Sequence, residues 1–195
     1  MLARDNGSSD ATVSILNEYA ERLPSRFRVM PSSPGTGSPK DNFLLLMRAS
    51  SAQYICFSDQ DDIWLPDKVS RTKKEMDELE SRWGADTPLL VFTDAHVVDD
   101  QLITLHESFW AREKIDPERI HHLALLLGRS VVTGCTMLLN RRLDGWPTSD
   151  RSTTNGLPHL RGCLHHPCTC AHSPAPYGVF RSEAISVVCF LRVQV

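Results

Sequence analysis

Three aspartates, Asp59, Asp61 and Asp62, stand within the four residues that follow the apolar run "YICFS". Carboxylates packed this closely repel one another and resist leaving water, so a partner usually compensates them. Oxygen ligands at the end of a rigid strand can hold a hard divalent cation and leave positions open for phosphate oxygens. Solvated loop carboxylates are the commoner alternative for any single aspartate. The cluster therefore indicates metal-assisted nucleotide chemistry, and the residues alone lead no further.

A second acidic segment, "TDAHVVDD", follows another apolar run and contains Asp94, Asp99 and Asp100. Ligands of open α/β sheets bind beyond the carboxyl ends of the strands. We therefore expect this segment and the "SDQDD" segment to line one crevice.

The elements that would position these residues alternate between strands and helices up to about residue 147. This order predicts an α/β sandwich with a mostly parallel sheet. Apolar spacing, turn residues and helix-start signals predict helices at 10–23, 40–51, 65–83 and 116–127, and strands at 26–30, 53–58, 88–98 and 130–140.

Composition narrows the classes of partner. The 195 residues suit one domain, 41% of them are hydrophobic, and the net charge of -3 gives no reason to expect a nucleic-acid partner. No apolar run reaches the length of a membrane span, and the start "MLARDNGSSD" lacks the apolar region of a signal peptide. We therefore expect no transmembrane segment, six reduced cysteines, and a place in the cytoplasm or at the inner face of the membrane.

Four segments carry a resemblance to a known family. "RDNGSSDATVSIL", "SDQDDIWLPDKV", "FTDAHVVDD" and "VVTGCTMLLNRRL" resemble, in order, successive motifs of glycosyltransferase family 2, especially its rhamnosyltransferase-like branch. The resemblance covers about residues 4–147. It implies the GT-A fold and inverting transfer of a sugar from a nucleotide-sugar donor, with dTDP-rhamnose as one candidate. It further implies Mg²⁺ or Mn²⁺ as cofactor, a glycan or lipid-linked acceptor, and a role in bacterial cell-wall or surface polysaccharide synthesis.

The resemblance also implies roles for individual residues. "DQD" matches the family's D-x-D motif, so Asp61 would bind the metal and Asp59 would face the ribose or the metal's water shell. Asp62 would orient that shell on the acceptor side or cap the following helix. "DNGSSD" matches the family's D-D-G-S-x-D, which holds base and ribose: Asp5 is retained, and Asn6 replaces the second carboxylate.

Three further residues are candidates on the same basis. Lys40 and Asn42 precede "FLLLM" and could contact the donor, although a plain helix N-terminus explains them equally well. Asp94 resembles a strand-end position near donor and acceptor.

The first departure from the family lies at the start of the chain. The family begins with a strand, a nucleotide-contacting loop and a helix before the segment that matches "DNGSSD", whereas Met1–Arg4 would be a stub of the second strand. We therefore expect 1–147 to be a partial domain that lacks its first strand–helix unit and exposes an unpaired sheet edge.

The second departure is the tail, 148–195. The family continues towards a His-Asp-x-Trp segment whose aspartate is the general base, and no such segment occurs here, so the catalytic residue stays unassigned. Read one base earlier, the codons of Ser152–Gly156 permit His, Asp, Gln and Trp. This predicts a disordered or frame-shifted tail and an inactive remnant. A zinc site at Cys163, Cys168, Cys170 and His172 is an alternative. A metal-dependent nucleotidyltransferase and a non-catalytic nucleotide-binding remnant are the other functions considered.

Overall fold

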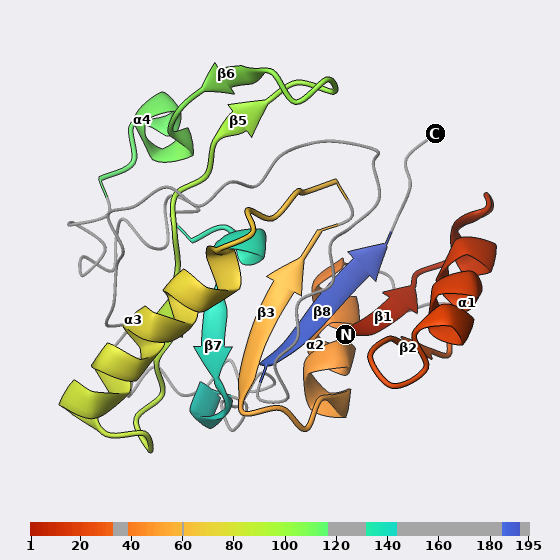
Figure 1. Cartoon of the computed structure of the whole chain (residues 1–195), viewed down its shortest axis with the longest axis horizontal. Helices are drawn as coiled ribbons and strands as arrows, with labels where there is room; N and C mark the ends of the chain where they lie inside the picture. Colours follow the sequence, from red (N-terminus) through yellow and green to blue (C-terminus); the bar gives the residue numbers. More distant parts are fainter. Residues whose placement is uncertain (33–38, 60, 117–131, 144–184, 192–195) are drawn as a thin grey trace, which may run out of the picture. The chain divides into compact units, whose positions relative to one another are not determined.

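The structure, a computed structural model, describes residues 1–32, 39–59, 61–116, 132–143 and 185–191. The chain forms two compact units, one made of Met1–Gln60 with Ser182–Val195 and the other of Asp61–Arg181. Figure 1 shows their elements. The helix predicted at 116–127 lies almost entirely outside the described residues, as do the cysteine- and histidine-rich segment 163–172 and the codons compared above. The expectations about these segments stay predictions.

The first unit is a parallel sheet with helices joining its strands, as the sequence predicted. Its strands lie in the order β2-β1-β8-β3, and every neighbouring pair among these four is parallel. The elements are β1 (Leu2–Asp5), α1 (Thr12–Arg22), β2 (Arg28–Met30), α2 (Pro39–Ala49), β3 (Tyr54–Ser58) and β8 (Ile185–Leu191).

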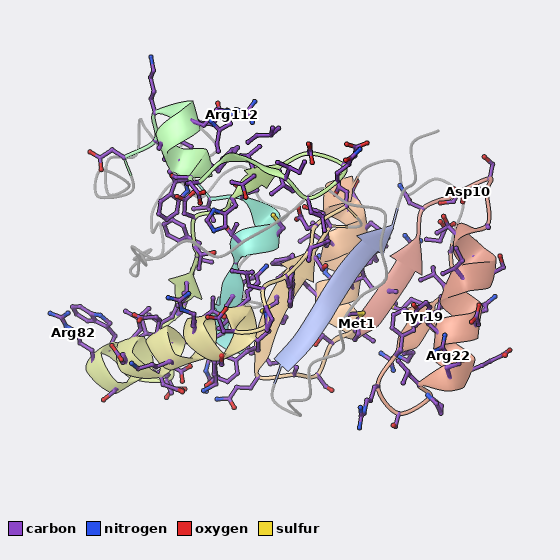
Figure 2. The ribbon with its side chains drawn as sticks, turned by 45° about the horizontal axis from the view of Figure 1, so that its top comes forward. Met1, Asp10, Tyr19, Arg22, Arg82 and Arg112 are labelled. Carbon is purple, nitrogen blue, oxygen red and sulfur yellow. The ribbon has the colours of Figure 1, made fainter. Side chains whose placement is uncertain are left out.

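Helix α1 starts where an acidic side chain binds its first backbone N–H. Asp10 Oδ1 accepts hydrogen bonds from Thr12 N at 2.9 Å and from Thr12 Oγ1 at 2.6 Å. Asp10 is the N-cap that the sequence predicts, but the N-cap residue of the helix is Ala11, so Asp10 acts from one position before it. Figure 2 shows Asp10 at the start of α1 and Tyr19 and Arg22 further along it. The Arg22 guanidinium lies 5.4 Å from the centre of the Tyr19 ring.

The apolar residues at helical spacing in α1 are Val13, Leu16 and Ala20, and this spacing predicts that they face the core. Leu16 is 3% exposed and packs with Ala3 of β1, whereas Val13, predicted to face the core, is 41% exposed. The buried residues Thr12 and Leu16 stand four positions apart, which places them on one face of the helix.

The expectation of an unpaired sheet edge is wrong for the facing sides of β1 and β3, because β8 pairs with both strands. Strand β8 lies between β1 and β3 (Figure 1), with Leu2 paired to Val188 and Tyr54 to Ile185. The sides of β1 and β3 that face β8 are therefore hydrogen-bonded. Within the predicted tail 148–195, the described residues are those of this strand.

The second unit combines a long helix with two antiparallel strand pairs, β4 with β7 and β5 with β6. The strand predicted at 88–98 is divided into β4 and β5, and the described part of the one predicted at 130–140 contains a 3-10 turn before β7. The elements are α3 (Lys68–Trp83), β4 (Leu90–Val91), β5 (Val97–Val98), β6 (Thr104–His106), α4 (Phe109–Glu113), η2 (Gly134–Thr136), β7 (Leu138–Asn140) and η3 (Arg141–Leu143).

Asn140 joins β7 to the chain around β4. Its side chain is 2% exposed, accepts a hydrogen bond from Leu89 N at 3.0 Å, and donates to Thr87 O at 2.9 Å and Glu80 Oε1 at 3.3 Å. A buried amide with its polar atoms bonded fixes the register of the β4–β7 pair. Among the helices of the described segments, none is long and apolar enough to cross a membrane.

Candidate functional site

The second unit contains a pocket of about 340 Å³. Its polar wall offers a carboxylate, an imidazole, a guanidinium, a hydroxyl and a thiol, while alanine, valine and phenylalanine side chains form the apolar part. A few polar groups converging on a partly apolar cavity is the usual composition of a small-molecule site. The lining residues are Asp62, Ala95, His96, Val97, Val98, Phe109, Arg112, Thr133 and Cys135.

The acidic cluster reaches this pocket through Asp62. Asp61 and Asp62 are both half-buried, and a carboxylate oxygen of Asp62 lies within 4.8 Å of Cys135 Sγ. Because α3 begins at Lys68 and its N-cap residue is Asp67, the alternative in which Asp62 caps the helix is wrong. The pocket thus brings Asp62 together with residues 95–98 of the second acidic segment.

A buried lysine supports the wall at Cys135. Lys68 is 1% exposed, its Nζ donates a hydrogen bond to the Cys135 carbonyl oxygen, and the same Nζ lies 3.9 Å from the centre of the Trp64 ring. A carbonyl oxygen and an aromatic face both stabilise a cation taken out of water. The apolar spacing in 65–83 predicts that the charged side chains of this helix face solvent. This prediction is wrong for Lys68.

Asp94 does not line the pocket but binds residues next to those that do. It is 7% exposed; its Oδ1 accepts hydrogen bonds from Ala95 N at 2.8 Å and Trp110 N at 3.0 Å, and its Oδ2 accepts one from Ser108 Oγ. Ser108 is the N-cap of α4 and accepts from Ala111 N at 2.9 Å. The carboxylate therefore holds the start of α4, the helix that carries Arg112 (Figure 2).

His96 is a pocket residue that the sequence analysis missed. Its side chain is 22% exposed, and its Nδ1 lies 3.1 Å from Oε2 of Glu107, whose side chain is 83% exposed. The sequence contains one signal for it, a histidine between Asp94 and Asp99. The sequence analysis considered only the carboxylates of this segment. Arg112 and Thr133 gave no pattern in the sequence that would have selected them.

In the first unit, Asp5 closes the turn that follows β1. Its side chain is 5% exposed, and its oxygens accept hydrogen bonds from Gly7 N at 2.8 Å and from Ser8 N at 3.1 and 3.2 Å. Gly7 has φ of 94°, a left-handed conformation that favours glycine. Asn6 is half-buried within this turn. The carboxylate thus shapes the loop that the resemblance assigns to the nucleotide.

Asn42 ties α2 to β1. It is 0% exposed; its Oδ1 accepts a hydrogen bond from Arg4 Nη1, and its Nδ2 donates to Arg4 O at 3.2 Å. Arg4 is itself 2% exposed, and its Nε donates to Pro31 O at 3.2 Å. These bonds favour the structural interpretation of Asn42 over donor contact. Lys40 lies in the first turn of α2.

The residues expected to hold a cation are suited to one by their chemistry. Asp59 and Asp61 are half-buried carboxylates, and both are close in sequence to the end of β3. Carboxylate oxygens are the ligands that Mg²⁺ and Mn²⁺ prefer. Each residue belongs to a different unit, so their roles as metal ligands stay predictions.

A family model matches most of the chain, and individual known proteins match shorter parts of it. The model of the family described as "Glycosyl transferase family 2" matches residues 1–145. The dTDP-rhamnosyl transferase RfbG of Shigella flexneri is 33% identical over 107 residues, which cover 53% of this chain and 32% of that protein. Uncharacterised proteins of Mycobacterium tuberculosis and Mycobacterium bovis are 33% identical over 78 residues, which cover 40% of this chain and 22% of each relative.

The chain therefore spans a third or less of the curated relatives it matches. No solved structure matches it. The family model covers more than half of the chain, including every described helix and strand except β8. The chain belongs to glycosyl transferase family 2.

Proposed function

We propose that this chain carries the donor-binding part of an inverting, metal-dependent glycosyltransferase. The observation that supports it most is the family match over residues 1–145, in which the aspartates of "SDQDD" fall. The relative named as a dTDP-rhamnosyl transferase makes dTDP-rhamnose the first donor to test. The acceptor would be a hydroxyl of a glycan or of a lipid-linked saccharide, reached in the cytoplasm or at the inner face of the membrane. The transferase domain would end near residue 147.

Three groups of residues would share the work. Asp61 and Asp59 would hold Mg²⁺ or Mn²⁺, which neutralises charge on the departing nucleoside diphosphate. Residues 5–6, together with Lys40, would contact the nucleotide and ribose. Asp62 would face the acceptor, since it lines the pocket of the second unit.

Titration calorimetry on the full chain tests this proposal. We expect dTDP-rhamnose to bind in the presence of Mn²⁺ and to bind at least about 10-fold more weakly after chelation, because the cation held by Asp59 and Asp61 would supply positive charge to the donor diphosphate. UDP-glucose serves as the comparison that tests donor preference. Equal binding with and without the metal would contradict the metal assignment, and no binding of either nucleotide sugar would contradict the function.

A further inference from the structure

Lys68 is a buried cation at a position that disfavours one. It is the first residue of α3 and is 1% exposed. Burial removes water from the ammonium group, and the first turn of a helix is the positive end of the helix dipole. A methionine of similar length would avoid both costs, since apolar side chains in place of buried charged groups are often neutral or stabilising. Stability alone therefore does not account for a lysine here.

The ammonium group of Lys68 contacts segments on two sides of the pocket in the second unit. On one side, Nζ lies 3.9 Å from the centre of the Trp64 ring, and Trp64 stands two residues after the pocket residue Asp62. On the other side, Nζ donates a hydrogen bond to Cys135 O in the η2 turn, which Figure 1 shows beside the start of α3. One buried group thus links the segment of Asp62 to the turn of Cys135.

The η2 turn has hydrogen bonds of its own that fix its shape. Thr136 N and Thr136 Oγ1 both donate to Thr133 O, at 3.0 and 2.8 Å. Bonds within a turn do not fix where the turn lies relative to α3, whereas the bond from Lys68 does. Because Thr133 and Cys135 line the pocket, the position of this turn sets the position of one pocket wall.

The two linked segments lie close together at the pocket. A carboxylate oxygen of Asp62 is within 4.8 Å of Cys135 Sγ. Binding sites depend on side chains held to a fraction of an ångström, and a misplacement of about 1 Å caused far from the chemistry can lower a rate about 100-fold. A group that fixes both segments therefore controls how Asp62 meets a ligand.

We propose that Lys68 is a positioning residue of this pocket, whose charge holds the Asp62 segment and the η2 turn in the arrangement that binds the sugar substrate. The inference rests on the proposed function for the identity of the ligand, and on the contacts of Lys68 for the positioning. With 1% of its surface exposed, Lys68 acts from behind the pocket wall, through Asp62 and Cys135.

The first test needs no substrate and uses the full chain. Iodoacetamide alkylation, resolved by peptide mass spectrometry, reports opening of the η2 turn at Cys135, which is 5% exposed. Hydrogen exchange at Trp110 N, which is bonded to Asp94, reports opening elsewhere in the same unit. Lys68→Met should raise the alkylation rate of Cys135 about 10-fold and leave the exchange rate at Trp110 within about twofold of wild type, because the opening is local.

Thr72→Val is the matched control, a second buried change in α3. Thr72 is 1% exposed, and its hydroxyl donates within the helix to Lys68 O at 2.9 Å. Both rates should stay within about twofold of wild type in this variant. Equal increases at Cys135 and Trp110 in Lys68→Met would show that Lys68 only stabilises the unit and would overturn the proposal. An unchanged rate at Cys135 would overturn it as well.

The second test measures binding of dTDP-rhamnose with Mn²⁺ by titration calorimetry. Lys68→Met should weaken binding about 10-fold, the loss typical of a residue that orients a ligand-binding side chain. Asp62→Ala should have a similar effect, and the double variant should lose little more than either single variant, because residues that act as a unit are not additive. An additive loss of about 100-fold would overturn the proposal. Absence of donor binding in wild type would instead contradict the proposed function, and the alkylation rates would still decide whether Lys68 positions the pocket.

Discussion

The turn after β1 and the segment between β4 and α4 both depend on a buried aspartate. Asp5 accepts hydrogen bonds from two backbone N–H groups close in sequence and closes a tight turn. Asp94 accepts from Trp110 N and Ser108 Oγ, which lie 16 and 14 residues further along. The first carboxylate therefore shapes a local loop. The second holds a helix against a distant strand end, and a pocket lies beside the elements it holds.

This difference separates aspartates that build a site from aspartates that serve in it. Asp5 and Asp94 are 5% and 7% exposed, and their oxygens are bound by the protein's own donors. Asp61 and Asp62 are half-buried, and Asp62 lines the pocket. We therefore expect substitutions in the first pair to cost stability and substitutions in the second pair to cost ligand binding.

The largest effect is expected for Asp61→Ala. If Asp61 holds the cation, its loss should weaken Mn²⁺-dependent binding of dTDP-rhamnose by about 100-fold or more, because a metal–phosphate interaction contributes several kcal/mol. Asp62→Ala should weaken it by about 10-fold, the effect typical of a residue that orients a ligand. Titration calorimetry measures both.

Asp100→Ala, at an exposed position of the second acidic segment, is the control and should bind as wild type does. Urea unfolding should give all three variants stabilities close to wild type. Binding that is unchanged in both Asp61→Ala and Asp62→Ala would remove the metal assignment.

Asp94→Ala is expected to have the largest effect on stability. It leaves Trp110 N and Ser108 Oγ without their acceptor in a buried setting, which should cost about 3 kcal/mol of the free energy of unfolding. Asp94→Asn keeps one acceptor oxygen and should lose less. Denaturant unfolding of the full chain, monitored by tryptophan fluorescence, gives the values.

The matched control is Asp77→Ala in α3, where the carboxylate is exposed and paired with Lys73. Exposed pairs of this kind contribute about 0.5 kcal/mol or less. Similar losses in the free energy of unfolding for Asp94→Ala and Asp77→Ala would contradict the distinction between buried and exposed aspartates. Burial and hydrogen bonding of the carboxylate would then have no measurable effect on stability.

The sequence predicted the elements well wherever local chemistry decides them. The helices at α1, α2 and α3 and the strands β2 and β3 follow from apolar spacing, helix-start residues and short apolar runs, and the structure confirms them. The prediction of one strand at 88–98 is wrong because the strand is interrupted between Val91 and Val97. Within this interruption, Asp94 accepts a hydrogen bond from Trp110 N of α4, and the apolar residues on both sides give no sign of it. No local pattern reveals a hydrogen bond to a residue 16 positions away.

The site was predictable in its chemistry and less so in its geometry. Acidic residues after an apolar run pointed to residues 59–62, and Asp62 does line a pocket. Lys68 was assigned to a solvated face because a lysine in a charged helix usually lies there, yet the carbonyl of Cys135 and the ring of Trp64 bury it. His96 lies within ion-pair distance of Glu107, and this contact depends on the register of the β5–β6 pair, which no local sequence pattern reveals.

In the first unit, Asn42→Ala extends the comparison to an amide. The substitution removes the two hydrogen bonds between Asn42 and Arg4 and weakens the support of a guanidinium that is 2% exposed. We expect a loss of about 2 kcal/mol in the free energy of unfolding, within the range for buried polar groups that lose a partner. Urea unfolding measures it.

Asn17→Ala supplies the same chemical change at an exposed position of α1 in the same unit. It should change stability by less than about 0.5 kcal/mol, as is usual for surface substitutions. Were Asn42→Ala as harmless as Asn17→Ala, the α2–β1 link would be dispensable. Asn42 would then return to the candidates for donor contact.

The smallest effect is expected at Asp10, the exposed counterpart of Asp5. The hydrogen bond from the Thr12 hydroxyl, followed by the one from the Thr12 backbone N–H, lowers the pKa of Asp10 below its ordinary 3.8. A carboxyl group with a depressed pKa in the folded state stabilises the protein above its unfolded pKa, and this contribution disappears as the pH falls through the folded pKa. The urea midpoint of wild type should therefore slightly exceed that of Asp10→Asn at pH 6, and the two should converge as the pH falls below 3.8 and through the lowered pKa of Asp10. Thr12→Val removes the hydroxyl donor and should bring the pKa of Asp10, followed by NMR, back towards 3.8. An Asp10 pKa at or above 3.8 in wild type would show that this exposed carboxylate, unlike Asp5 and Asp94, does no structural work.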